Sequence, residues 1–80
     1  MDYFVYILKG IPNWHYVGFT TNVDSRLAQH NGGQARSTKA HRPFGLFFVQ
    51  VVNTKDKARD LEKFLKIRFN KEALIEIVSS

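Results

Sequence analysis

The chain has 80 residues, a formal net charge of +5 and no cysteine, which excludes disulfides and thiolate zinc sites. Its longest apolar run, GLFFVQVV at 45–52, is far too short to cross a bilayer, and its first residues lack the basic segment and cleavage site of a secretory leader. Apolar residues make up 44% of the chain, which is enough to supply a core. We therefore expect a single domain over residues 1–80, in the cytoplasm and without membrane attachment.

The first predicted elements form a β-hairpin. Residues 2–9 (DYFVYILK) and 15–20 (HYVGFT) are rich in aromatic and β-branched side chains, which is typical of strands. Residues 10–14 (GIPNW) between them carry the Gly, Pro and Asn of a turn.

The hairpin register decides where its tyrosines lie. We expect three cross-strand pairs, Lys9 with His15, Leu8 with Tyr16, and Tyr6 with Gly18. Tyr6 and Tyr16 are then diagonal neighbours on one sheet face, and Gly18 leaves open space above Tyr6 where a ligand could approach. A shift by one residue would separate the tyrosines. The alternative is ordinary strand filling for each Tyr and a bulge for Gly18.

A helix is predicted next, over residues 22–33 (NVDSRLAQHNGG). Asn22 or Thr21 can cap its start, and Gly32-Gly33 end it. Residues 34–45 are predicted to form a basic loop or a broken helix, and residues 46–53 a third strand.

The C-terminal part is predicted to be mainly helical. A long helix is expected over residues 54–69, capped by Thr54 or Asn53, followed by a short helix or strand over 70–78. The order of the elements predicts an α/β (α+β) fold, in which helices flank a small three-stranded antiparallel sheet.

The positive charge is concentrated in the middle of the chain. Between Asp24 and Asp56 there is no acidic residue, but this interval holds Arg26, Arg36, Lys39, Arg42 and Lys55, together with His30 and His41. Such a segment favours a polyanionic partner, of which nucleic acid is the commonest. The alternative is solubilising surface charge.

One carboxylate of the long predicted helix lies among apolar residues. At about 100° per residue, one face of this helix gathers Ala58, Leu61, Leu65 and Phe69. Glu62 falls inside this stripe, where a carboxylate is unfavourable unless it is paired or binds a cation. The alternative is a glutamate at the edge of the stripe that reaches water or pairs with a nearby lysine.

The first predicted helix carries two basic residues beside its apolar side. Val23 and Leu27 define that side, and Arg26 and His30, four residues apart, lie on its flank. The alternative is a surface pair in which His30 complements the C-terminus of the helix. Together with the tyrosines and Glu62, the two residues would form a set suited to phosphodiester hydrolysis.

The order and spacing of these residues resemble the GIY-YIG endonuclease superfamily. Tyr6 and the YVG of 16–18 are followed by Arg26, His30 and Glu62, with ten residues from Tyr to Tyr, ten from Tyr to Arg and four from Arg to His. The layout is most similar to small stand-alone members related to the nuclease domain of the bacterial excision-repair subunit UvrC. The resemblance covers residues 3–76. Positions 4–6 read FVY and keep only the tyrosine of the first family tripeptide.

The resemblance implies hydrolysis of phosphodiester bonds with one Mg²⁺ or Mn²⁺, held by Glu62 as the only protein ligand. It makes Tyr6 the general base or a group that orients water, and Tyr16 a group that positions a metal-bound water or the phosphate. Arg26 would neutralise charge on the phosphoryl oxygens. His30 would bond the phosphate, position Tyr6 or share the proton transfer.

The resemblance also implies a nucleic acid partner, and we expect DNA, selected by structure or not at all. The residues expected to contact its backbone are Gly18, Arg36, Lys39, Arg42 and Lys55. Whether Asn70 or His41 joins the site is left open, as is a homodimer or a partner protein. The alternative function is a nucleic-acid-binding module with little or no cleavage, and a third is a structural α/β domain.

Overall fold

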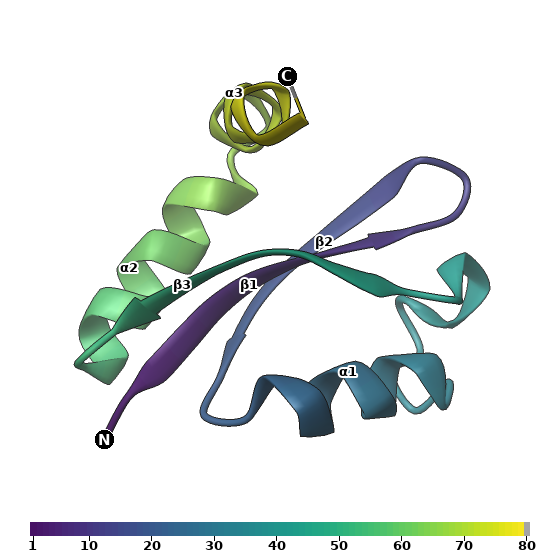
Figure 1. The fold of residues 1–80 in the computed structure, drawn as a ribbon, viewed down its shortest axis with the longest axis horizontal. Helices are drawn as coiled ribbons and strands as arrows, with labels where there is room; N and C mark the ends of the chain where they lie inside the picture. The colour runs from purple at the N-terminus through teal and green to yellow at the C-terminus, as the bar shows by residue number, and fades with distance from the viewer. Residues whose placement is uncertain (80) are drawn as a thin grey trace.

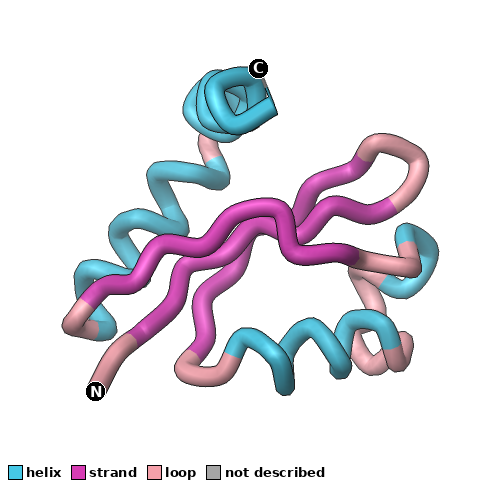
Figure 2. Tube along the Cα trace, viewed as in Figure 1, coloured by secondary structure: helices cyan, strands magenta, loops and turns pink. Residues whose placement is uncertain are grey.

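The computed structural model describes residues 1–79 and contains a three-stranded antiparallel sheet with helices on both sides (Figures 1 and 2). The elements in chain order are β1 (Tyr3–Gly10), β2 (Trp14–Thr20), α1 (Val23–Asn31), the 3₁₀ helix η1 (Lys39–His41), β3 (Gly45–Val52), α2 (Lys55–Lys66) and α3 (Arg68–Ser79). The strand order is β2-β1-β3, which confirms the predicted α+β class. Among the helices of residues 1–79, none has the length and apolarity needed to cross a membrane.

The predicted hairpin register is confirmed. Tyr6 lies opposite Gly18, Leu8 opposite Tyr16, and Lys9 opposite His15. Side chains alternate between the two faces of a strand, so Tyr6 and Tyr16 share a face, and their ring centroids are 6.3 Å apart.

Two capping residues begin the main helices. The side-chain oxygen of Asn22 accepts a hydrogen bond from the Ser25 amide (3.0 Å), and the Thr54 hydroxyl accepts one from the Lys57 amide (3.1 Å). Each bond satisfies an amide that has no partner inside its helix. Asn22 therefore caps α1, and Thr54 caps α2.

The prediction of one helix over residues 54–69 is wrong at its C-terminal end. Ile67 has an extended backbone (φ −66°, ψ 122°), and a separate helix begins at Arg68. The side-chain amide of Asn70 donates from Nδ2 to the Phe64 carbonyl (2.9 Å) at the end of α2, so this carbonyl has a partner despite the break. Phe69 is consequently 78% exposed and is not part of the core. Residues 70–78 are helical rather than extended.

The core has two halves, one on each side of the sheet. On the α2 side, the buried cluster is aliphatic: Val5, Ile7, Val17, Ala58 and Leu65. On the α1 side, the buried cluster is Tyr6, Leu8 and Phe44, with Trp14, Tyr16 and Leu27 packed around it.

The outer strand β3 is less well covered than the other two. Leu46, Val49 and Val51 are 48%, 40% and 47% exposed. They lie opposite Leu8, Tyr6 and Phe4 of β1, and therefore project from the α1 side of the sheet. α1 thus covers β1 more fully than β3.

Candidate active site

A cleft of about 460 Å³ lies beside the β1–β2 hairpin. Its lining residues are Tyr3, Tyr6, Tyr16, Gly18, Phe19, Thr20, Thr21, Arg26, Lys55 and Glu62. Four of the five predicted catalytic residues are therefore in one cleft, supplied by β1, β2, α1 and α2. Gly18 and Lys55, predicted to contact nucleic acid, line the same cleft.

Gly18 provides room for a side chain rather than for a ligand. A Cβ atom at this position would lie 2.6 Å from the hydroxyl oxygen of Tyr6 and 3.1 Å from the Tyr16 ring. The space predicted above Tyr6 is thus occupied by its own phenol. Only glycine at position 18 lets this phenol lie against β2.

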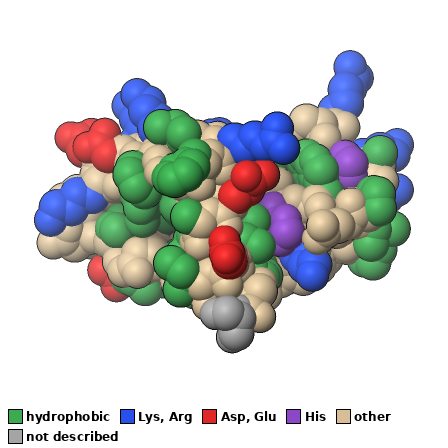
Figure 3. Space-filling model, turned by 90° about the horizontal axis from the view of Figure 1, so that it is seen from above, with side chains coloured by type: hydrophobic (Ala, Val, Ile, Leu, Met, Phe, Trp, Pro, Cys, Tyr) green, Lys and Arg blue, Asp and Glu red, His purple; other side chains and the backbone are tan. Residues whose placement is uncertain are grey.

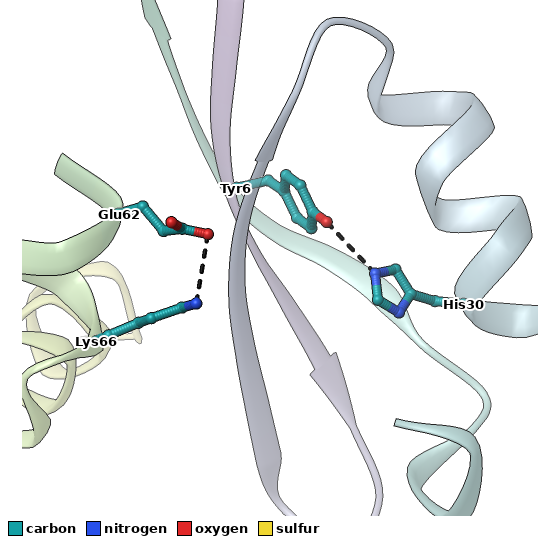
Figure 4. A network of polar contacts seen from close by, with 4 residues as sticks. All are labelled: Tyr6, His30, Glu62 and Lys66. Atoms are coloured by element: carbon teal, nitrogen blue, oxygen red, sulfur yellow. Dashed lines mark hydrogen bonds and ion pairs between the residues drawn. The ribbon is translucent and has the colours of Figure 1, made fainter. Parts of the chain in front are cut away.

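The fifth predicted residue, His30, contacts the cleft through Tyr6. The Tyr6 hydroxyl lies 3.3 Å from Nε2 of His30, and Figure 4 shows the tyrosine ring pointing from β1 toward the histidine. The other ring nitrogen, Nδ1, lies 2.9 Å from the Thr38 hydroxyl. His30 is 2% exposed and Thr38 is fully buried. Both His30 nitrogens therefore have a protein partner, as a buried imidazole requires.

The end of α1 is fixed to the start of β3 next to His30. The Asn31 side chain donates to the Phe44 carbonyl (3.0 Å) and accepts from the Phe44 amide (2.6 Å). The Phe44 ring packs edge-on against His30, with centroids 5.8 Å apart. These contacts hold the imidazole in place against Tyr6.

Burial keeps the Tyr6–His30 pair neutral. Desolvation, then the nearby Tyr16 and Glu62, raise the pKa of Tyr6 well above its ordinary value, while Arg26 opposes this rise. Desolvation, followed by the charge of Arg26, lowers the pKa of His30 below its ordinary 6.5. At neutral pH a protonated phenol therefore faces a neutral imidazole.

Glu62 faces the cleft and also has a partner on its own helix. Its Oε2 lies 3.4 Å from Nζ of Lys66, one turn further along α2, and Figure 4 shows both side chains reaching from α2 toward the sheet. The Glu62 side chain is 18% exposed and that of Lys66 is 53% exposed. The alternative of pairing with a nearby lysine is thus confirmed, but the carboxylate still lines the cleft.

The donor set fits a hard cation that keeps most of its water. Within residues 1–79, no three His, Asp or Glu side chains lie close enough to hold a metal together. The cleft offers one carboxylate, from Glu62, together with phenol and hydroxyl oxygens. Mg²⁺ is commonly held by one or two carboxylates and water, so these residues are compatible with it.

Three of the predicted backbone-binding residues lie outside the cleft. Arg36, Lys39 and Arg42 are exposed on or beside η1, and Nε of Arg42 donates to the Lys39 carbonyl (2.9 Å). Near them is a smaller hollow of about 270 Å³, lined by Arg26, Gln29, His30, Gln34 and Ala35. Arg26 is common to both hollows. By contrast, the face seen in Figure 3 carries acidic side chains at its centre.

The two residues left open by the sequence have other contacts. Asn70 lines an apolar hollow between β3, α2 and α3 and bonds the Phe64 carbonyl. His41 donates from Nδ1 to the Ile11 carbonyl (2.8 Å) and stacks on Trp14, with centroids 3.9 Å apart. Neither residue lines the cleft.

The sequence does not point to Thr38 as a residue of the site. It lies in the segment RSTK, where the charged side chains are the main signal. A fully buried hydroxyl in an otherwise exposed basic loop would have been a signal, but burial cannot be read from so short a polar stretch.

Comparison with known proteins agrees with this architecture. The GIY-YIG catalytic domain family matches residues 2–74. The chain is 35% identical over 77 residues to the UPF0213 protein SH2523 of Staphylococcus haemolyticus, covering 95% of this chain and 93% of the relative. It is 36% identical over 78 residues to the UPF0213 protein YazA of Bacillus subtilis, covering 94% and 79%. The solution NMR structure of the UPF0213 protein BH0048 from Bacillus halodurans aligns with a TM-score of 0.62 and 34% identity, covering 96% of this chain and 85% of that one.

Proposed function

Since the chain belongs to the GIY-YIG family, we propose that it is a metal-dependent endonuclease that hydrolyses phosphodiester bonds in DNA. The observation that carries the proposal is the cleft that gathers Tyr6, Tyr16, Arg26 and Glu62, with Tyr6 bonded to the buried His30. Phenol, guanidinium, imidazole and carboxylate are groups that can serve such a hydrolysis as base, phosphate ligand and metal ligand. We expect the enzyme to act in the cytoplasm.

Tyr6 and His30 act together as the base. A water attacks phosphorus and gives one proton to the Tyr6 oxygen, while Tyr6 gives its own proton to Nε2 of His30. This concerted transfer avoids a free phenolate, which the raised pKa of Tyr6 makes unfavourable. The bond from phosphorus to the 3′-oxygen breaks, and this oxygen takes a proton from solvent. The products carry a 5′-phosphate and a 3′-hydroxyl.

Arg26 and Tyr16 act on the phosphate. The guanidinium of Arg26 can donate two parallel hydrogen bonds to phosphoryl oxygens and neutralise the charge that develops on them. The Tyr16 hydroxyl positions the phosphate or a water beside it. Both side chains line the cleft next to Tyr6.

Glu62 would hold the cation, after its ion pair with Lys66 has opened. Because Lys66 is more than half exposed, its ammonium can move into water at little energetic cost. The ion that Glu62 would hold, Mg²⁺ or Mn²⁺, would supply positive charge to polarise the phosphate and stabilise the leaving oxygen.

We propose that DNA is bound through its backbone and without a long recognition sequence. Lys55 reaches the strand inside the cleft, and Arg36, Lys39 and Arg42 contact it outside. Contacts of this kind give salt-dependent affinity but carry no base specificity.

A cleavage assay tests the function. The protein is incubated with labelled single-stranded, duplex, branched and flap DNA and with RNA, in Mg²⁺, Mn²⁺ or EDTA. Glu62→Gln is compared with Glu72→Gln, which removes a carboxylate from a similar but exposed ion pair with Arg68. We expect metal-dependent cleavage of DNA that Glu62→Gln loses and Glu72→Gln keeps.

The second candidate is a module that binds nucleic acid without cutting it. It is favoured by the Glu62–Lys66 ion pair, which offsets the carboxylate charge that would otherwise repel phosphates. It predicts no cleavage on any substrate and salt-sensitive binding that is equal in the wild type and Glu62→Gln. That result would overturn the proposal that the protein is an endonuclease.

A further inference from the structure

A buried chain of hydrogen-bonding groups runs from the cleft into the loop after α1. It begins at the Tyr6 hydroxyl, passes through both nitrogens of His30 and continues to the Thr38 hydroxyl. The Thr38 oxygen lies in turn 3.2 Å from the Ala35 carbonyl. Tyr6, His30 and Thr38 are each no more than 2% exposed, so the protons in this chain are held by the protein.

The three donors along this series of hydrogen bonds, the Tyr6 hydroxyl, the His30 ring N–H and the Thr38 hydroxyl, can all be satisfied in one arrangement. The atom of Ala35 that contacts Thr38 is the carbonyl oxygen, which can only accept, so the Thr38 hydroxyl donates to it. The Thr38 oxygen then accepts from Nδ1–H of His30. Nε2 of His30 is then unprotonated and accepts from the Tyr6 hydroxyl. In the opposite tautomer, Nε2–H donates to Tyr6, and the tyrosine proton loses its acceptor in this chain.

We propose that Thr38 is a positioning residue that holds His30 in the Nδ1–H tautomer, so that Nε2 is free to receive the Tyr6 proton. This inference rests on the proposed function, because a proton acceptor behind Tyr6 has a use only if Tyr6 activates water. Thr38 touches neither the cleft nor the reacting atoms and acts only through His30.

The loop backbone holds Thr38 at the position that this role needs. The Thr38 amide donates to the Ala35 carbonyl (3.1 Å), and the Thr38 carbonyl accepts from the His41 amide (3.0 Å). The hydroxyl therefore comes from a turn that is bonded on both sides. In a serine protease whose orienting aspartate is replaced by asparagine, the histidine base is held in the wrong tautomer and the rate falls by about 10⁴-fold.

The test compares Thr38→Val, which keeps the side-chain shape but lacks the hydroxyl, with Thr38→Ser, which keeps the hydroxyl. The first measurement is the ¹⁵N NMR spectrum of protein labelled at its three histidines. The His30 signals are identified by their loss in His30→Gln. We expect a protonated Nδ1 and an unprotonated Nε2 in the wild type and in Thr38→Ser, and an increased share of Nε2–H in Thr38→Val.

The second measurement is cleavage. We expect a loss of about 10²-fold or more in Thr38→Val and near wild-type rates in Thr38→Ser. An Nε2–H tautomer in the wild type would overturn the inference, and so would a Thr38→Val protein that keeps both the tautomer and the rate. If Thr38→Val does not fold, the wild type and Thr38→Ser spectra still decide.

The two proposals can fail separately. If the wild type cuts no substrate, the endonuclease fails, but the change in tautomer between wild type and Thr38→Val still supports a positioning role for Thr38. If cleavage is robust and the tautomer is insensitive to Thr38, the endonuclease stands and the positioning role is overturned.

Discussion

The two faces of β1 are equally buried but are used differently. On the α2 side, Val5 and Ile7 are fully buried among aliphatic side chains. On the α1 side, Tyr6 is buried just as deeply but lies beside the polar His30 and Thr38. Aliphatic burial stabilises the fold directly, whereas a buried polar group is tolerated only when it is hydrogen-bonded. The α2 side of β1 thus mainly supplies stability, whereas its α1 side carries the Tyr6–His30 pair of the site, which Glu62 reaches from α2.

The largest expected effect on activity is that of Tyr6→Phe, on the α1 side of β1. It keeps the buried ring but removes the hydroxyl that bonds His30. We expect cleavage to fall by about 10²–10⁴-fold, while the free energy of unfolding falls by only about 1–3 kcal/mol because Nε2 loses its partner. Steady-state cleavage and urea denaturation measure the two effects. Full activity in the variant would remove Tyr6 from the mechanism.

Ile7→Ala is the matched change on the opposite face of the same strand. Ile7 is fully buried against the α2-side cluster, so its truncation should lower the free energy of unfolding by about 2–5 kcal/mol. Urea denaturation measures the loss. Cleavage per folded molecule should stay at the wild-type value, and a drop beyond the folded fraction would contradict the division between the faces.

Gly18→Ala tests how closely Tyr6 lies against β2. The new Cβ would lie 2.6 Å from the Tyr6 oxygen, so the buried ring must leave its present position beside His30. A misplacement of the reacting group by about 1 Å is expected to reduce cleavage by about 10²-fold. Gly45→Ala is the control, because a Cβ there has nothing within 4 Å. Equal rates in the two variants would show that the position of the phenol is unimportant.

The smallest expected effect is the dependence of stability on pH. Tyr6 of β1, Tyr16 of β2 and Arg26 of α1 surround His30, whose pKa is lowered by burial and by Arg26. The unfolded chain therefore binds more protons than the folded one as the pH falls below the ordinary value of 6.5, and stability is lost in that direction. His15 acts in the same way, since burial, Lys9 and Lys71 lower its pKa.

Melting curves between about pH 7.5 and about pH 5 measure this dependence. We expect the melting temperature to fall on acidification, and to fall less steeply in His30→Gln, which lacks the contribution of His30. An identical slope in the two proteins would mean that His30 titrates in the folded state as it does in the unfolded one.

The strands and their register could be predicted because they depend on local sequence. Residues 3–8 are all aromatic or aliphatic, and the turn at 10–14 fixes the pairing; a shift by one residue would put Tyr6 and Tyr16 on opposite faces. The break between α2 and α3 could not be predicted. No Gly or Pro marks Ile67, and the apolar stripe of Leu61 and Leu65 continues through Phe69 in the sequence alone.

The cleft residues could be predicted from their spacing, but their connection to the interior could not. Arg26 and His30 share a helix face, yet only the structure places His30 behind Tyr6 and makes it 2% exposed. Thr38 lies eight residues further along the chain in a polar loop. Its contact with Nδ1 depends on how that loop closes over α1, which local sequence does not encode.

The outer edge of β3 bears on the solubility of the protein. Among the strands of residues 1–79, this edge has no neighbour, and Leu46, Val49 and Val51 are exposed along the strand. Such an edge can pair with another strand in concentrated solution, and repulsion between chains of charge +5 opposes this pairing. Salt screens that repulsion and also releases bound nucleic acid. We therefore expect salt that strips nucleic acid during purification also to favour self-association of the protein.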